Sequence, residues 1–245
     1  MNRGPWIAAA AMTAFVVVLL ARFPARWAAG ALPRGTTCLQ LDGTLWNGRC
    51  TEFVAEGTPL GDLGWQAHPL RLLLGKLSLT VSLTRLGDTV RGRVELSPGG
   101  AITAQAVHAS LPINRRLLSQ LPPTVDGALQ IDLDSLHWNG KRITAIEGTV
   151  DVHGLTVRGE SLGDYRVSFP AGPGRPGDEP AGRVQDLGGP LEVQGTLRLM
   201  REPGFELDTT IAPRANAPPD IVSALRILGT PDARGRRPFS VQMTL

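Results

Sequence analysis

The chain has 245 residues, with 25 lysines and arginines against 22 aspartates and glutamates, and it contains 29 glycines and 20 prolines. This glycine and proline content favours many short strands joined by turns over long helices. Four of the arginines precede the first acidic residue, Asp42, so the rest of the chain is nearly neutral and lacks the clustered cations of a nucleic-acid-binding surface. We therefore expect no nucleic-acid partner.

An uncharged run of eighteen residues, GPWIAAAAMTAFVVVLLA, lies between Arg3 and Arg22. It reaches the lower length limit of a membrane-spanning helix, and tryptophans flank it as they do at membrane interfaces. A cleaved signal peptide is the alternative, with AAGA at 28–31 as its cleavage region, but arginines follow the apolar run where small neutral residues are expected. The sequence therefore predicts, in order, a cytoplasmic tail (1–4), a transmembrane anchor (5–21), a juxtamembrane linker (22–37) and a folded body (38–245).

The chain has two cysteines, Cys38 and Cys50, which lie twelve positions apart at the start of the body. This spacing suits one disulfide in an oxidising compartment, and two unrelated buried thiols are the alternative. Arginines on both sides of the anchor leave its orientation open, and the positive-inside rule alone leans towards a cytoplasmic body. The four histidines are scattered and no Cys-x-x-Cys occurs, so we expect neither a metal nor a cofactor.

Two stretches of the chain read almost alike: CLQLDGTLWNGRC at 38–50 and LQIDLDSLHWNGKR at 129–142. Asn-Gly is a preferred hairpin turn because both residues tolerate a positive φ, so equivalent turns are predicted in both copies: Trp46, Asn47, Gly48 and Trp138, Asn139, Gly140. A regular hairpin turning at Asn47–Gly48 would separate the two cysteines by more than about 20 Å, whereas a disulfide needs Cα atoms within about 7 Å. A bridge therefore requires a fold-back at Asp42–Gly43 or an irregular hairpin.

Further matches follow in the same order along the chain. LGDLGWQA at 60–67 corresponds to LGDYRVSF at 162–169, and GRVELSPGGAI at 92–102 corresponds to AGRVQDLGGPL at 181–191. Ordered matches of this kind indicate an internal duplication. We place its halves at about 38–126 and 127–245.

Most of the body alternates apolar and polar residues with period two, which is typical of antiparallel strands with one wet and one dry face. Helical signals are confined to 115–121, 220–228 and a turn at 70–74, and the glycine- and proline-rich segment 172–183 reads as an exposed loop. The predicted fold is mainly β. An N-terminal transmembrane helix precedes a curved or rolled antiparallel sheet built from two similar halves, each with one short helix.

GESLG at 159–163 matches the Gly-x-Ser-x-Gly pattern of a hydrolase nucleophile elbow, which requires a strand before Ser161 and a helix after it. The following DYRVSF alternates as a strand, and the corresponding GTPLG at 57–61 has a proline in place of the serine. Two glycines that bracket a turn explain both copies, so we expect no catalytic residues and no enzyme. Three arginines near the C-terminus are either a solvated turn or a contact for an acidic partner: Arg234, Arg236 and Arg237.

The whole chain resembles protein N of the type II (general) secretion system (GspN). The resemblance rests on an ordered series of segments: FPARWAAG at 23–30, GTLWNGR at 43–49, LGDLGWQAHPLRLLLGKL at 60–77, LGDYRV at 162–167, GGPLEVQGTLRL at 188–199 and LRILGTPDARGRRPFSV at 225–241. It implies a single-pass inner-membrane protein whose body lies in the periplasm, an orientation that agrees with a disulfide.

The resemblance also implies a non-enzymatic part of the export machinery. Such a scaffold would bind other inner-membrane platform proteins, namely components L and M, with C as a further candidate. A weaker resemblance is to AsmA-type periplasmic proteins, which are implicated in lipid handling through a β-lined groove. That alternative predicts an apolar concave face.

Overall fold

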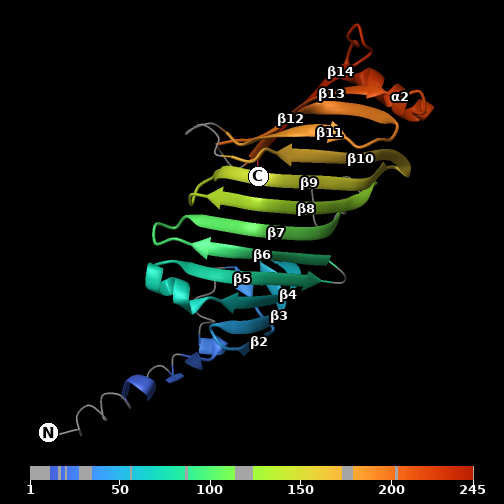
Figure 1. The fold of residues 1–245 in the computed structure, drawn as a ribbon. Coiled ribbons are helices and arrows are strands. Elements are labelled where there is room, and N and C mark those ends of the chain that lie inside the picture. Colours follow the sequence, from blue (N-terminus) through green and yellow to red (C-terminus); the bar gives the residue numbers. More distant parts are fainter. Residues whose placement is uncertain are drawn as a thin grey trace, which may run out of the picture. The chain divides into compact units, whose positions relative to one another are not determined.

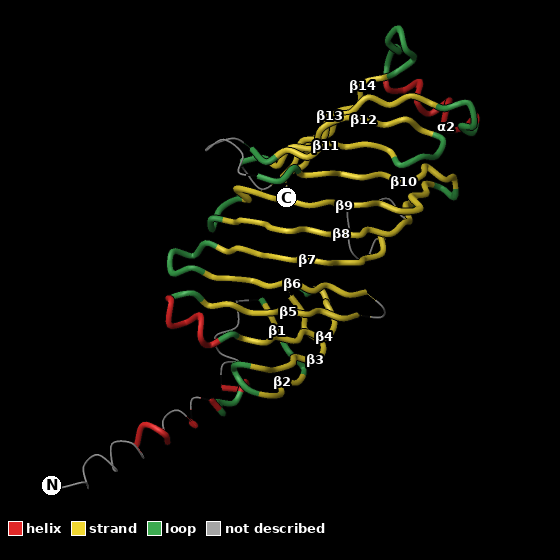
Figure 2. Tube along the Cα trace, viewed as in Figure 1, coloured by secondary structure: helices red, strands yellow, loops and turns green. Residues whose placement is uncertain are grey.

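A computed structural model describes residues 12–15, 18–19, 21–27, 35–55, 57–85, 88–113, 124–172, 179–201 and 204–244. The chain forms two compact units, unit 1 at Met1–Gly87 and unit 2 at Asp88–Leu245. Figures 1 and 2 show that both consist mainly of strands running side by side, with few helical segments. The described fold is therefore mainly β, with open antiparallel sheet, as the alternating sequence predicts.

Unit 1 is a small antiparallel sheet in the order β1-β3-β4-β5, with β2 paired to β3 beside β1. Between β4 and β5 the chain makes one short 3-10 helix, η2, which corresponds to the turn expected at 70–74. The bounds are β1 (Thr36–Thr37), β2 (Gln40–Gly43), β3 (Asn47–Ala55), β4 (Thr58–Ala67), η2 (Pro69–Leu74) and β5 (Leu77–Arg85).

Unit 2 is an antiparallel meander in which each strand pairs with the next along the chain, from β6 to β14. Its strands are β6 (Asp88–Leu96), β7 (Ile102–Ile113), β8 (Val125–Trp138), β9 (Ile143–Val157), β10 (Glu160–Phe169), β11 (Ala181–Asp186), β12 (Leu191–Leu199), β13 (Gly204–Pro213) and β14 (Arg237–Thr244). The helical segment expected at 220–228 is α2 (Pro219–Leu225), continued by η3 (Arg226–Leu228).

A compact core lies where α2 covers one face of β11 and β12. Val184, Leu191 and Val193 point from these strands towards Ile221 and Leu225 of the helix, and all five are buried. Pro219 occupies the first helical turn, where its missing N–H costs nothing, and Asp220 places a negative charge at the positive end of the helix. The apolar faces of β11 and β12 are thus covered by α2, which follows them in the chain.

Several sequence expectations meet the structure at segment boundaries. The prediction of an exposed loop at 172–183 is wrong at its C-terminal end, because Ala181–Asp186 forms β11 between β10 and β12. The helix expected at 115–121 lies outside the described residues. The division at 87/88 does not coincide with the repeat boundary expected near 126, and the duplication stays a prediction.

Most of the predicted anchor also lies outside the described residues. Within 12–27, the described positions 12–15, 18–19 and 21 are helical. Among the residues that the structure describes, no helix has both the length and the apolar character needed to cross a bilayer. The anchor remains an expectation from the sequence.

Candidate functional site

The β2–β3 hairpin shapes the most distinctive site of unit 1. Its register pairs Gly43 with Gly48, so the connection is Thr44–Trp46, whereas Asn47 and Gly48 begin β3. The amide of Thr44 donates to the Asn47 carbonyl at 2.8 Å, and the Asn47 amide donates to the Thr44 hydroxyl at 3.1 Å. The predicted turn at Asn47–Gly48 is therefore wrong.

The reason is the glycine of the other turn dipeptide, Asp42–Gly43. Gly43 has φ +89°, and a Cβ there would lie 2.4 Å from the Asn47 carbonyl oxygen, so only glycine permits this tight connection. This shift of the turn brings Leu41 opposite Cys50. A regular hairpin turning at Asn47–Gly48 would instead have placed Leu45 there.

This register explains the cysteines. The chain bends at Leu39, whose amide donates to the Thr51 carbonyl, and Cys38 then lies beside Cys50 with a Cα–Cα distance of 5.7 Å. The two cysteines form a disulfide, and Cys50 is completely buried. The disulfide therefore joins the residue that precedes β2 by two positions to the middle of β3.

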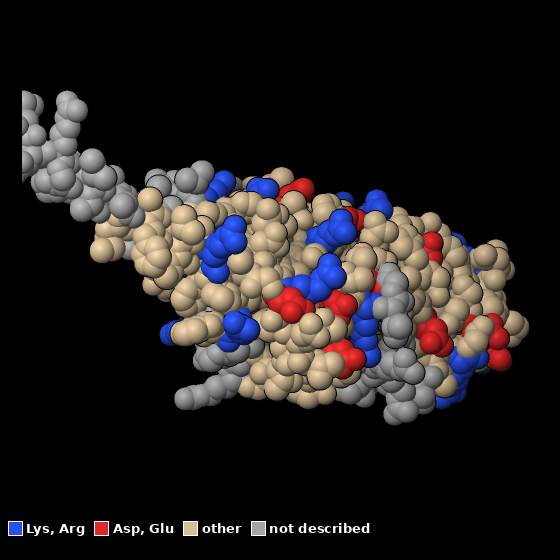
Figure 3. All heavy atoms as spheres, turned by 90° about the horizontal axis from the view of Figure 1, so that it is seen from below, with Lys and Arg blue, Asp and Glu red and all other residues tan. Residues whose placement is uncertain are grey.

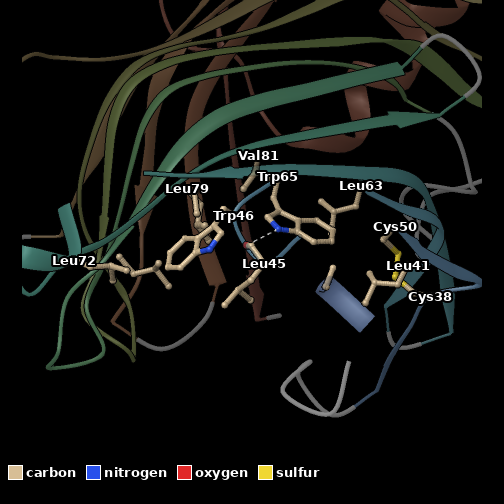
Figure 4. Close-up of a pocket in the computed structure, with 13 residues that line it drawn as sticks. Cys38, Leu41, Leu45, Trp46, Cys50, Leu63, Trp65, Leu72, Leu79 and Val81 are labelled. Atoms are coloured by element: carbon tan, nitrogen blue, oxygen red, sulfur yellow. Dashed lines mark hydrogen bonds between the residues drawn. A yellow bond between two sulfur atoms is a disulfide. The ribbon is translucent and has the colours of Figure 1, made fainter. Parts of the chain in front are cut away.

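An apolar pocket of about 560 Å³ lies between this hairpin and the strands β4 and β5. Alanine, cysteine, leucine, valine and tryptophan side chains alone line it, and Figure 4 shows the labelled side chains converging on one space. The lining residues are Ala25, Cys38, Leu41, Leu45, Trp46, Cys50, Leu63, Trp65, Ala67, Leu72, Leu77, Leu79 and Val81. Period-two alternation in β4 and β5 puts their apolar residues on this face.

Trp65 forms the middle of the pocket wall (Figure 4). Its indole N–H donates to the Leu45 carbonyl at 3.0 Å, so the ring offers only apolar surface to the pocket. The ring lies against Gly48, where a Cβ would come within 2.2 Å of it, which explains a glycine at that strand position. Trp46 lies on the hairpin connection, and its carbonyl accepts from the Ala67 amide at 2.6 Å. The Trp65 ring is therefore held by its own hydrogen bond, and the main chain at Trp46 is held to the end of β4.

The segment before the body contributes a further wall. Ala25 lines the pocket and is 1% exposed, and Pro24 forms a β-bridge with Thr44. The Leu45 amide donates to the Phe23 carbonyl at 2.9 Å. The linker predicted from the sequence is therefore bound to the hairpin over residues 23–25.

The second Trp-Asn-Gly site is built differently. Trp138 ends β8, Asn139 and Gly140 lie in the connection to β9, and Trp138 pairs with Ile143. The Asn139 side-chain oxygen accepts from the amides of Lys141 and Arg142, each at 3.0 Å. Equivalence of the two turns is therefore not found.

The two Leu-Gly-Asp segments, by contrast, adopt the same local structure. Gly61 in β4 and Gly163 in β10 have φ of +94° and +97°, and both sit at a bulge against the preceding strand. The carboxylate of Asp62 accepts from the Glu52 amide at 3.1 Å, and that of Asp164 accepts from the Gly154 amide at 2.7 Å. In each hairpin the donor lies ten residues before the aspartate, which supports the duplication over these segments.

Ser161 belongs to the same hairpin. It lies within β10 and pairs with Thr156 across the hairpin, so a strand and not a helix continues after it. A nucleophile elbow requires a strand-to-helix turn at the serine. The local geometry is that of a bulged β-hairpin.

The three C-terminal arginines make different contacts. Arg236 pairs with Asp232 at 3.0 Å, Arg237 donates to the Gly229 carbonyl, and Arg234 is exposed. The Asp232 carboxylate also accepts from the amides of Arg234 and Arg236, and these hydrogen bonds keep the pKa of Asp232 below its usual range. Arg234 and Arg236 lie in the turn before β14, and Arg237 is the first residue of that strand. On the face drawn in Figure 3, basic and acidic residues are interspersed.

The sequence did not locate a pocket, although the AsmA-type alternative predicts an apolar concave face. The signal was present in the apolar positions of LGWQA and LSLTV, which all fall on one face. Alternation does not distinguish a face covered by other residues from one that leaves a cavity. Whether the face is covered or leaves a cavity depends on the register of the β2–β3 hairpin and on the β-bridge between Pro24 and Thr44. Both are contacts that a local sequence pattern does not specify.

Comparison with known proteins gives the family. A family model described as "Type II secretion system (T2SS), protein N" matches residues 34–240. The chain belongs to the type II secretion system protein N family. Type II secretion system protein N of Vibrio cholerae serotype O1 is 25% identical over 230 residues, covering 86% of each chain. The Aeromonas hydrophila protein of the same name is 26% identical over 256 residues, covering 99% of each.

No solved structure matches the chain. The resemblance to protein N inferred from the ordered segments is confirmed. The family match begins at residue 34 and ends at 240, so it includes the helix-covered face of unit 2 and every residue that lines the pocket of unit 1 except Ala25.

Proposed function

We propose that this chain is a non-enzymatic scaffold of the type II secretion inner-membrane platform. It is anchored in the inner membrane by residues 5–21 and carries its body in the periplasm. There it binds other platform proteins during export of folded proteins, namely components L and M, with C as a further candidate. The observation that carries the proposal is the family match over nearly the entire body.

The Cys38–Cys50 disulfide supports the periplasmic location, because structural disulfides persist in oxidising compartments and are rare in the cytosol. The positive-inside rule alone favours a cytoplasmic body, but it rests on very few charges here, and we give the disulfide more weight. The strand geometry around Ser161 supports a non-enzymatic role.

The outer edge of β14 is the surface we propose for a partner. β14 pairs with β13 on one side, and no described strand pairs with its other side. Pro238 lies within β14, and proline is tolerated mainly on edge strands because it cannot donate to a ladder. An open edge presents backbone groups to which an extended segment of another protein can add as a strand.

Site-specific crosslinking tests this proposal. The full chain, in membranes that contain the secretion platform, receives a photoreactive residue at Gln242 of β14. The matched control carries it at Gln130 of β8, which is also an exposed strand glutamine but lies between two paired strands. Irradiation is expected to yield an adduct with a platform component at position 242 and much less at 130. Absence of a platform adduct at both positions, or equal adducts, would contradict the proposed edge.

Co-purification from the same membranes tests the wider claim independently of the edge. We expect at least one platform protein to be retained by the unsubstituted chain. Recovery of none would falsify the scaffold role, whichever surface is involved.

Lipid handling is a second candidate function, and the apolar pocket of unit 1 favours it. This candidate corresponds to the AsmA-type alternative, which predicts an apolar concave face.

A further inference from the structure

We propose that the pocket of unit 1 binds one acyl chain of a membrane phospholipid, whose headgroup stays near Arg22 and Arg26. The site is separate from the edge of β14 and does not depend on platform binding. Three features carry the inference: the chemistry of the lining, the rigidity of the wall, and the segment that borders it.

The lining favours an apolar occupant. Its volume of about 560 Å³ falls within the range of roughly 300–1,000 Å³ that is typical of ligand sites. Water against this lining would find few polar partners, whereas an ordered water makes two to four hydrogen bonds. The Trp65 indole N–H is already bonded to the Leu45 carbonyl. A polar ligand group would lose its hydrogen bonds to water without replacement, whereas a hydrocarbon chain loses none.

The wall is pre-formed. The disulfide joins Cys38 to Cys50 on one side, and the Trp65–Leu45 hydrogen bond joins β4 to the hairpin connection on another. The pocket therefore does not need to be opened by unpacking side chains, and little ordering cost opposes binding.

The segment that borders the pocket, residues 15–27, indicates that the acyl chain would come from the membrane. The apolar side chains of Phe15, Val18, Leu19 and Trp27 are exposed by 51–72%, and they border a second hollow of about 520 Å³ together with Arg22 and Arg26. Apolar side chains followed by arginine and tryptophan are typical of a membrane interface, and arginines there attract anionic headgroups.

Ala25 lines the pocket, while its chain neighbours Pro24 and Arg26 line the second hollow. It lies between Arg22 and Arg26 in the bordering segment and yet lines the pocket, because Pro24 bridges to Thr44. A phospholipid whose phosphate is held at these arginines would reach the pocket by turning one acyl chain out of the bilayer and past Ala25. This arrangement favours a lipid over a partner's side chain.

A photoreactive lipid tests the proposal on the unsubstituted full chain. The chain is reconstituted in phosphatidylethanolamine vesicles containing phosphatidylglycerol with a diazirine in its acyl chain, irradiated, digested and mapped by mass spectrometry. Lipid adducts are expected on the peptides that carry Leu41–Trp46, Leu63–Ala67 and Leu77–Val81. The peptide that carries Ile227, which is 87% exposed but lies outside the pocket, is the control for chance contact.

Two variants sharpen the result. Val81→Trp places a large side chain at the pocket wall and should reduce pocket adducts at least several-fold while adducts on residues 1–27 persist; its unfolding midpoint checks the fold. Arg22→Gln with Arg26→Gln should reduce the preference for labelled phosphatidylglycerol over labelled phosphatidylcholine. Adducts confined to residues 1–27, or equally frequent on the Ile227 peptide, would overturn the proposal. Because no secretion protein is present, the outcome does not depend on the scaffold role.

Discussion

The two units treat their apolar sheet faces differently. In unit 2, the face of β11 and β12 is covered by α2, whose Ile221 and Leu225 pack on Val184, Leu191 and Val193. In unit 1, the apolar face of β4 and β5 is bordered by a short hairpin and residues 23–25, and a pocket of about 560 Å³ remains. Similar alternating strands therefore lead to a filled core in one unit and to a cavity in the other.

The difference lies in the covering element. A helix presents a stripe of large side chains that interdigitate with a sheet, and IVSAL in α2 supplies one. The β2–β3 hairpin is tightly connected at Gly43 and held by a disulfide, and it borders the pocket without filling it. In unit 1 the disulfide takes over part of the stabilisation that core packing provides in unit 2.

The largest contrast is expected from matched leucine truncations. Leu191→Ala removes a side chain that is 6% exposed and packed under α2, so we expect it to lower the free energy of unfolding by about 2–5 kcal/mol. Leu79→Ala removes a half-buried side chain that already borders a cavity, and about 1 kcal/mol is expected. Urea unfolding of both variants measures the difference. Equal losses would mean that the unit 1 face is packed as tightly as that of unit 2.

Removal of the disulfide should affect unit 1 selectively. Replacement of both Cys38 and Cys50 by serine is expected to lower stability by about 2–4 kcal/mol, because the bridge restricts the unfolded chain. Hydrogen exchange of the intact protein measures where protection is lost. We expect the loss in β2 and β3 and little change in β11 and β12. Uniform loss over both units would contradict their separate stabilisation.

Glycine substitutions test whether the two units share the same bulged hairpin. A Cβ at Gly163 would lie 2.5 Å from the Gly188 carbonyl oxygen, and one at Gly61 would lie 2.4 Å from the Thr84 carbonyl oxygen. Gly163→Ala and Gly61→Ala should each cost about 2–3 kcal/mol, from the positive φ and the clash together.

The matched controls are Gly159→Ala and Gly57→Ala. Both glycines have a positive φ but open space around the Cβ position, so only about 1 kcal/mol is expected. Thermal unfolding of the four variants gives the comparison. If the clash-bearing variants differed strongly from each other, the two bulges would not be equivalent, and the argument for a duplication over these segments would weaken.

The sequence was sufficient for the strand content, the helical segment at 220–228 and the family, because these depend on periodicity and ordered segments. It was insufficient for the hairpin of unit 1. Asn47–Gly48 is the stronger turn signal in isolation, but the chain turns earlier, where Gly43 permits a positive φ and Pro24 bridges to Thr44. The pocket depends on that hairpin register, so the local sequence pattern alone could not predict it.

The smallest expected effect is a change in the titration of the chain's single tyrosine, which reports on the sheet face that α2 covers. Tyr165 packs against the core under α2 and donates to the Leu162 carbonyl at 2.6 Å. Burial of the phenol, with a further contribution from the nearby Asp186 charge, raises the pKa of Tyr165 from 10.0 to about 12. The folded protein therefore retains this proton between pH 10 and 12, where the unfolded chain loses it, so stability should fall as the pH rises through this interval.

Stopped-flow pH jumps can follow phenolate absorbance before the chain unfolds. Immediate ionisation is expected near pH 12 in the unsubstituted chain and closer to pH 10 in Leu225→Ser, in which the helix cover is weakened. Val81→Trp alters only the face in unit 1 and should leave the titration unchanged. Ionisation near pH 10 in the unsubstituted chain would show that α2 does not seal its face, and the contrast between a covered and a hollow sheet would then be lost.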